Sequence, residues 1–168
     1  MRHLRLSIAA TALLGWEATC LASERLPTPA GPVLLTVSGA IEHTNGPGQA
    51  EFDQAMLEEL GTATLETHTV LTNGLQRYEG VPLAAVLGRI GARGTALHAT
   101  AANAYEVDIP LTDLQYAPLI AMRANGRTLT LRDKGPLWIV YPRDAHTVLQ
   151  DQRYDSRWIW HLIRLRVE

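Results

Sequence analysis

Cysteine, lysine and long apolar runs are scarce in this chain of 168 residues. The single cysteine, Cys20, excludes an intramolecular disulfide framework. Lys134 is the one lysine among 15 basic residues, and 17 acidic residues bring the formal net charge to -2. Without a positive surplus, the chain is not expected to bind nucleic acid through a broad basic surface.

The familiar catalytic motifs are missing as well. The chain has no glycine-rich phosphate loop, no Gly-x-Ser-x-Gly turn and no dinucleotide fingerprint. Its histidines do not form the closely spaced pair that zinc sites use. Simple motif matching therefore predicts neither a nucleotide site nor a metalloprotease.

The N-terminus has the pattern of an export signal. Arg2 and Arg5 precede the uncharged stretch Leu6–Trp16, and small residues close the segment at Ala22. The apolar stretch is shorter than the ~20 residues that a membrane-spanning helix needs. We therefore expect residues 1–22 to be a cleavable signal peptide, and the protein to be periplasmic without a membrane anchor. Removal of the signal also removes Cys20, leaving no thiol.

The remaining chain predicts one domain. Residues 23–32 hold three prolines and are interpreted as a linker-like lead-in, and residues 33–168 as a single domain. A hydrophobic content of 46% with 19% charged residues is typical of a folded globular protein. This length suffices to bury a core without disulfides.

The residue patterns predict a β-rich α+β fold. An apolar stripe at helical spacing favours a helix over residues 80–90, ended by Gly91, and a shorter helix is expected over 53–60. Alternation near the C-terminus puts His161 on the apolar side of the last strand, where we expect a core histidine. Strands are expected at residues 33–37, 62–72, 96–101, 105–109, 119–124, 128–132, 137–141 and 158–167.

Three stretches are rich in residues that bind ligands. Asn103 and Tyr105 offer hydrogen-bonding groups at a break between strands, although an Asx turn with a packed tyrosine explains them equally well. Arg132 and Lys134 at one end of an apolar strand, and Arg143 at the other, suit an anionic group, although solvated strand ends are an equal alternative. The stretch 157–160, with two tryptophans, either borders a pocket for a planar ligand or packs in the core.

Several short sequences follow one another in a recognisable order: Tyr78–Leu83 ahead of the helix, Asn103-x-Tyr105, the Asn125-Gly126 hairpin, Gly135-Pro136-Leu137, Tyr141-Pro142 and a closing Trp160. From residue 52 to 167 the chain resembles the oxidoreductase molybdopterin-binding domain. This is the fold of sulfite oxidases and of periplasmic methionine-sulfoxide reductases of that type. The resemblance implies mixed β-sheets with a barrel-like core and a few short helices. It also implies a molybdenum-pterin cofactor held by a cysteine thiolate and by basic residues at the pterin phosphate.

The chain departs from that pattern at the metal ligand. His68 lies where the family has its cysteine, and the exported chain contains none. A thiolate is the soft anionic ligand of the oxo-molybdenum centre, whereas an imidazole is neutral. These departures argue against oxo transfer of the usual type while leaving the fold prediction unchanged.

Three functions stay open at this point. The first is a periplasmic oxidoreductase-like domain that binds a pterin-type cofactor or keeps only its pocket. The second is a redox enzyme, molybdenum-pterin-dependent, whose metal is held by the pterin and a non-cysteine group. The third is a cofactor-free ligand-binding or sensory module that partners a membrane signalling protein. The predicted pocket residues are His68, Asn103, Tyr105, Arg132, Lys134 and Tyr141.

Overall fold

A computed structural model describes residues 26–168 of the chain. The predicted signal segment, residues 1–22, lies outside the described residues, and so does its Cys20. None of the helices in the described part combines the length and apolar character that crossing a membrane requires.

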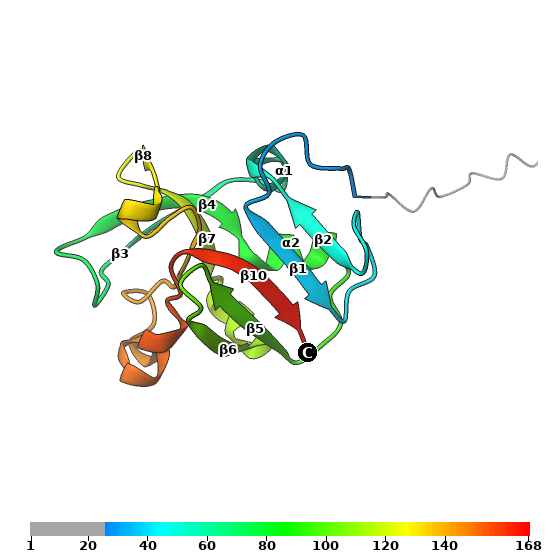
Figure 1. Cartoon of the computed structure of the whole chain (residues 1–168). Helices are drawn as coiled ribbons and strands as arrows, with labels where there is room; N and C mark the ends of the chain where they lie inside the picture. The colour runs from blue at the N-terminus through cyan, green and yellow to red at the C-terminus, as the bar shows by residue number, and fades with distance from the viewer. Residues whose placement is uncertain (1–25) are drawn as a thin grey trace, which may run out of the picture.

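The first of two sheets joins the beginning and the end of the domain (Figure 1). Its strand order is β2-β1-β10-β5-β6, in which β1 and β10 run parallel and all other neighbours are antiparallel. In the parallel pair, Thr36 lies opposite Arg164. The strands are β1 (Leu35–Gly39), β2 (Gln49–Phe52), β5 (Ala96–Ala101), β6 (Glu106–Pro110) and β10 (Leu162–Val167).

The second sheet is antiparallel and is built around β7. One edge of β7 pairs with β4, which in turn pairs with β3. The other edge is shared by two short strands: β9 pairs with residues 119–121 and β8 with residues 123–124. The strands are β3 (Ala63–Thr67), β4 (Gln76–Pro82), β7 (Leu119–Ala124), β8 (Arg127–Thr128) and β9 (Trp138–Val140).

Short helices connect and cover these strands. The predicted class, a β-rich α+β fold with a few short helices, is confirmed. Within residues 26–168 the two sheets stay open and do not close into a barrel. The helices are α1 (Gln54–Glu59), α2 (Leu83–Arg89) and the 3-10 helices η1 (Leu111–Tyr116), η2 (Leu131–Asp133), η3 (Thr147–Gln150) and η4 (Gln152–Arg157).

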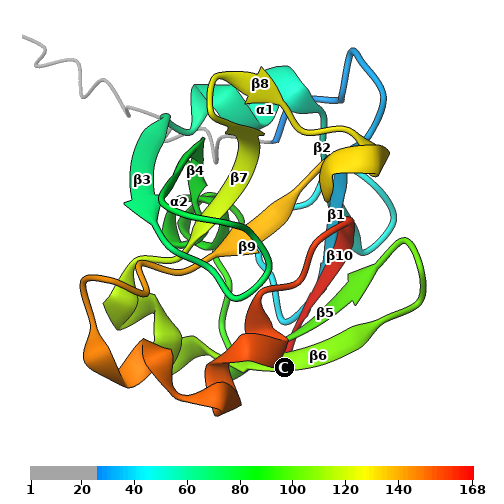
Figure 2. The ribbon, with the colours of Figure 1, turned by 90° about the vertical axis from the view of Figure 1, so that its left-hand side faces the viewer.

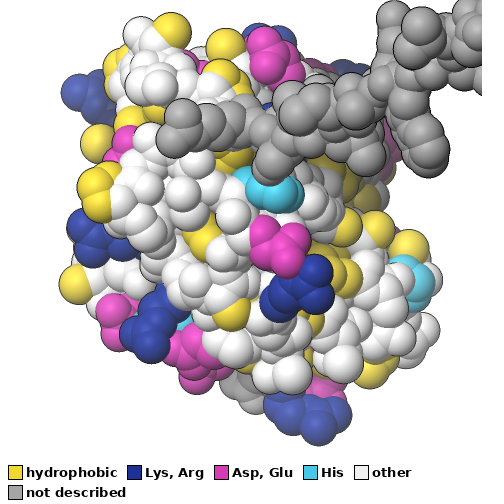
Figure 3. Space-filling view, turned by 90° about the vertical axis from the view of Figure 1, so that its right-hand side faces the viewer, with side chains coloured by type: hydrophobic (Ala, Val, Ile, Leu, Met, Phe, Trp, Pro, Cys, Tyr) yellow, Lys and Arg dark blue, Asp and Glu magenta, His cyan; other side chains and the backbone are white. Residues whose placement is uncertain are grey.

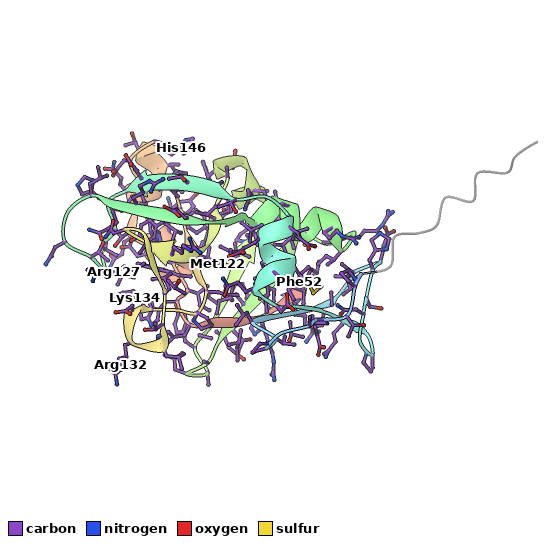
Figure 4. All side chains as sticks on the ribbon, turned by 90° about the horizontal axis from the view of Figure 1, so that it is seen from above. Phe52, Met122, Arg127, Arg132, Lys134 and His146 are labelled. Atoms are coloured by element: carbon purple, nitrogen blue, oxygen red, sulfur yellow. The ribbon has the colours of Figure 1, made fainter. Side chains whose placement is uncertain are left out.

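The core lies between the sheets and under the helices. Figure 4 looks down on the molecule and shows the β3–β4 side and the β10 side as separate layers with side chains between them. Aromatic rings fill the part of the core near β9, where the ring centroids of Tyr78 and Trp138 are 5.2 Å apart, edge to face. Apolar residues alternate with more exposed ones along β5, as the period of a strand requires.

The predicted helix over residues 80–90 is wrong at its beginning. The helix starts at Leu83, and Gly80 belongs to β4. A Cβ on Gly80 would overlap the carbonyl oxygen of Ile120 on β7, so the close approach of the two strands requires glycine there. Gly91 has a φ of 61° and follows the helix end, as predicted.

Three predicted strands are also corrected. The strand over 62–72 ends at Thr67, and the strand over 128–132 is replaced by β8 and η2. In the last strand, the register shifts between Leu162 and Arg164, and His161 has a φ of 55°. The shift reverses the alternation, so Leu162 is buried while His161 is half-buried and not a core residue.

Asp53 caps α1 and holds the segment that precedes β1. Its Oδ1 accepts a hydrogen bond from the amide of Met56 at 2.9 Å. Its Oδ2 accepts from the amides of Ala30 and Gly31, both at 2.8 Å. These backbone hydrogen bonds lower the pKa of Asp53 below 3.8, because they favour the charged carboxylate.

We predict that Asp53→Asn loses stability in a pH-dependent way. Because the folded-state pKa is lowered, the ionised carboxylate stabilises the fold fully above the unfolded pKa of 3.8. The advantage of the wild type over the variant should be constant near neutral pH and decrease as the pH falls through 3.8 and below. Urea unfolding at a series of pH values measures this difference. Glu59→Gln, on the exposed side of α1, is the control, and a pH-independent difference would contradict the prediction.

Candidate functional site

A basic pocket opens between the β7–β8 hairpin, η2 and the chain that leads into β4. Its volume is about 490 Å³, compared with about 230 Å³ for a cavity between α1 and β4. We call it the basic pocket. It is lined by Thr72, Gln76, Tyr78, Ala124, Asn125, Arg127, Thr128, Leu129, Arg132, Asp133, Lys134 and Trp138.

The lining of the basic pocket contains three cations and one carboxylate. Figure 4 shows Arg127, Arg132 and Lys134 at the same end of the molecule. Within the described chain, none of the three forms an ion pair with a carboxylate, whereas Asp133 accepts a hydrogen bond from Thr130 Oγ1 at 2.7 Å. The face in Figure 3 instead shows acidic and basic side chains interspersed. The surplus positive charge suits an anionic ligand.

Local backbone geometry positions Lys134. Residues 131–133 form η2, whose N-cap Thr130 accepts a hydrogen bond from the amide of Arg132, and Lys134 then adopts a φ of 71°. The Lys134 Nζ lies 5.7 Å from the ring centroid of Trp138. The ammonium group is therefore held against an aromatic surface of the pocket.

The fully buried Tyr78 also lines the basic pocket and packs edge to face on Trp138. Burial raises the pKa of Tyr78, whose buried hydroxyl has no hydrogen-bond partner among the described residues. Thr69 Oγ1 and Thr72 Oγ1 lie 2.8 Å apart and share a hydrogen bond. Tyr78 therefore stays neutral and contributes apolar surface rather than charge.

A second pocket, of about 250 Å³, has a different character. We call it the apolar pocket. The Tyr105 hydroxyl donates a hydrogen bond to the carbonyl oxygen of Ser156 at 3.1 Å, which links the β5–β6 turn to η4. Asn103 Oδ1 accepts from the amide of Tyr105 at 3.2 Å, as expected for an Asx turn. The lining residues are Val70, Leu71, Asn103, Tyr105, Asp155, Ser156, Trp158 and Trp160.

The β3–β4 loop borders both pockets. Val70 and Leu71 line the apolar pocket, and Thr72 lines the basic pocket. Figure 2 shows this loop crossing in front of β9, with β8 and η2 on one side and the η3–η4 segment on the other. The two pockets are therefore neighbours, and the β3–β4 loop contributes residues to both.

The structure divides the six predicted pocket residues. Arg132 and Lys134 lie together in the basic pocket, and Asn103 and Tyr105 lie together in the apolar pocket. His68 lies apart from these two pairs, since it is exposed at the end of β3, where its Nδ1 is 2.8 Å from Asp144 Oδ2. Hydrogen bonds from His68 lower the pKa of Asp144.

Tyr141 is fully buried and also lines neither pocket. Its hydroxyl donates a hydrogen bond to Asp113 Oδ2 at 2.9 Å. Burial raises the pKa of Tyr141 far above its ordinary value, and the Asp113 carboxylate raises it further. Tyr141 is thus a core residue that hydrogen-bonds Asp113 and does not contact a ligand in either pocket.

Sequence reasoning predicted only Arg132 and Lys134 of the basic pocket and missed, among others, Arg127, Tyr78 and Trp138. Arg127 lies directly after the Asn125-Gly126 turn, and a hairpin signal followed by a cation was the available clue. Tyr78 and Trp138 come from strands that are distant in sequence, and no local pattern shows that they share a pocket. The stretch 157–160 did contribute, because both of its tryptophans line the apolar pocket.

The donor set of the described residues does not suit molybdenum. Residues 26–168 contain no cysteine, and they hold no group of three or more histidine, aspartate or glutamate side chains placed to bind a metal ion. A soft thiolate is therefore not available from this part of the chain. The cations and aromatic surface of the basic pocket do suit a phosphate-bearing planar molecule.

Comparison with known proteins supports the fold. No family model matches the chain, and no curated protein matches it. The solved structure of the sulfane dehydrogenase SoxCD from Paracoccus pantotrophus is similar, with a TM-score of 0.59 and 19% sequence identity. The fold is of the sulfite oxidase type. The alignment covers 79% of this chain but 37% of the SoxCD chain, so this chain spans well under half of that neighbour.

A buried ion pair holds η4 beside the apolar pocket. Arg157 Nη1 donates hydrogen bonds to Asp113 Oδ1 and Oδ2 at 2.9 and 2.7 Å. The Asp113 side chain is 4% exposed and that of Arg157 21%. The guanidinium also lies 4.6 Å from the ring centroid of Tyr154. The pair therefore anchors η4 on η1.

We predict that Asp113→Ala destabilises the protein by about 3 kcal/mol, because it leaves a largely buried guanidinium without its counter-charge. The double variant Asp113→Leu with Arg157→Met should recover part of the loss, since it removes both charges. Urea unfolding gives the free energies. Arg153→Met, which breaks an exposed pair with Asp151, is the control and should change little. A loss in the double variant equal to that of Asp113→Ala would contradict this account.

Proposed function

We propose that this domain binds an anionic, phosphate-bearing planar ligand of the pterin type in the basic pocket, in the periplasm. The observation that carries the proposal is the set of three cations, Arg127, Arg132 and Lys134, which form no ion pair within residues 26–168 and line the pocket together with Trp138. Cations bind phosphate oxygens, and an aromatic surface accepts a planar ring system.

The organic part of molybdopterin fits this pocket better than the metal part does. Arg127, Arg132 and Lys134 would hold a terminal phosphate, while Trp138, which is 1% exposed and has the Lys134 ammonium 5.7 Å from its ring centroid, would support the bottom of the pocket. When bound with its metal, such a cofactor supplies oxygen-atom transfer. No described residue offers the thiolate that this chemistry uses, so the proposal is a ligand-binding role rather than oxo transfer.

Binding of defined probes tests the site. 6-Hydroxymethylpterin phosphate monoester should bind about tenfold more tightly than 6-hydroxymethylpterin, because charge-assisted hydrogen bonds act on the phosphate alone. Arg132→Ala and Lys134→Ala should each weaken the monoester by about fivefold and leave the uncharged pterin unchanged. Isothermal titration calorimetry measures both affinities. Arg164→Ala, which removes an exposed side chain of β10, is the control. Equal affinity for the two probes would contradict the proposal.

The composition of protein purified from the periplasm tests the role. We expect pterin fluorescence after oxidation, with molybdenum, zinc and copper all below stoichiometric amounts. Stoichiometric molybdenum, measured by elemental analysis, would favour a redox enzyme whose metal is held by the pterin. Protein free of both metal and pterin would favour a cofactor-free sensory module acting with a membrane signalling partner.

A further inference from the structure

The apolar pocket differs from the basic pocket in the sign of its charge. Asp155 is the single charged side chain among the described residues that line the apolar pocket. Arg127, Arg132 and Lys134 belong to the lining of the basic pocket instead. A phosphate finds no cation in the apolar pocket, so the two neighbouring pockets suit ligands of opposite charge.

The charged residues of η4 leave one carboxylate without a counter-charge. Arg153 Nη2 lies 3.0 Å from Asp151 Oδ2 at the beginning of the helix. Arg157 Nη1 lies 2.7 Å from Asp113 Oδ2 at its end. Asp155, between the two arginines in the sequence, forms no ion pair within residues 26–168. Its Oδ1 is covered from water, so the carboxylate acts on a ligand through space and not by contact at that atom.

Apolar and aromatic side chains that a ligand can reach form most of the lining. Val70 is 51% exposed and Tyr105 is 44% exposed. Leu71 and Trp160 are half-buried. The Tyr105 side chain is held at its far end, because its hydroxyl donates a hydrogen bond to the Ser156 carbonyl oxygen. Aromatic rings attract cations, and the attraction increases as water is excluded.

Two hydrogen-bond acceptors of the lining are already used within the protein. Asn103 Oδ1 accepts from the Tyr105 amide, and the Ser156 carbonyl oxygen accepts from the Tyr105 hydroxyl. An ammonium group with several N–H bonds would therefore lose its hydration without gaining enough acceptors. A quaternary ammonium group has no N–H bond to satisfy, and its methyl groups suit an apolar lining.

We propose that the apolar pocket is a second binding site and takes a small quaternary ammonium cation. The methyl groups contact Tyr105, Trp160 and the aliphatic side chains of the β3–β4 loop, and the Asp155 carboxylate supplies the counter-charge. An uncharged molecule of the same shape lacks the attraction to the carboxylate and to the rings, and an anion is repelled. The proposal goes beyond the pterin-type ligand and does not depend on it.

Choline and its uncharged carbon analogue dimethylbutanol, in which a tert-butyl group replaces the trimethylammonium group, test the proposal. Each is titrated into ¹⁵N-labelled protein, and the backbone amide signals are followed by NMR. Choline should shift the signals of the lining residues in a saturable manner and bind at least about fivefold more tightly than the alcohol. Equal affinities, or choline shifts confined to other parts of the protein, would overturn the proposal.

Asp155→Asn tests the counter-charge. It should weaken choline about fivefold and leave the affinity for the alcohol unchanged, because only choline is attracted by the carboxylate. Asp151→Asn is the matched control: it removes the same charge from the N-cap of η4, outside the pocket lining, and asparagine can still cap the helix. Equal effects of the two variants on choline would overturn the proposal, since choline would then respond to net charge alone.

Tyr105→Leu tests the aromatic contact. It should weaken choline about fivefold but not the alcohol, whereas Tyr105→Phe keeps the ring and should bind choline like the wild type. An equal loss of both probes in Tyr105→Leu would overturn the proposal, because the ring would then act through its shape alone. Inorganic phosphate should not displace choline, and Arg132→Ala should not change choline affinity, so failure at one pocket is distinguishable from failure at the other.

Discussion

The Asp113 carboxylate is the interaction on which the pocket region depends. It lies in η1, between β6 and β7, and receives hydrogen bonds from Arg157 on η4 and from Tyr141 after β9. A buried carboxylate is costly without such partners, so these three segments can pack together only in one arrangement. That arrangement fixes η4, and η4 supplies Asp155, Ser156 and the cap residue Trp158 to the apolar pocket.

Local sequence patterns predicted the elements whose side chains alternate or repeat regularly. β5 and β7 have the bounds that their patterns indicate, and α1 lies inside the predicted range. β4 was missed because its identity depends on pairing with β3 and β7, which are distant in sequence. The bulge near His161 was missed for a similar reason, since the His161 amide donates to Lys134 and its carbonyl accepts from Ala102.

In the candidate sites, too, residues that are close in sequence were predicted, whereas residues that only the fold brings together were not. Arg132 with Lys134, and Asn103 with Tyr105, were predictable because each pair is local and chemically distinctive. That the pairs belong to two pockets follows from the path of the β3–β4 loop, which no residue pattern reveals. The likeness to SoxCD extends to the fold, while the chemistry of the described donor set differs from what the family resemblance implied.

The parallel pairing of β1 with β10 has a consequence for how the domain assembles. β10 lies between β1 and β5 in the first sheet, although β1 and β10 are the first and last strands in the sequence. The sheet therefore has no stable partial form made from its first strands alone, because β1 contacts only β2 until the last strand arrives. Long-range pairing of this kind slows folding, since the intervening chain must be closed into a loop first. The first sheet is thus expected to be completed late, when β10 joins β1 to β5, whereas the second sheet does not depend on that strand.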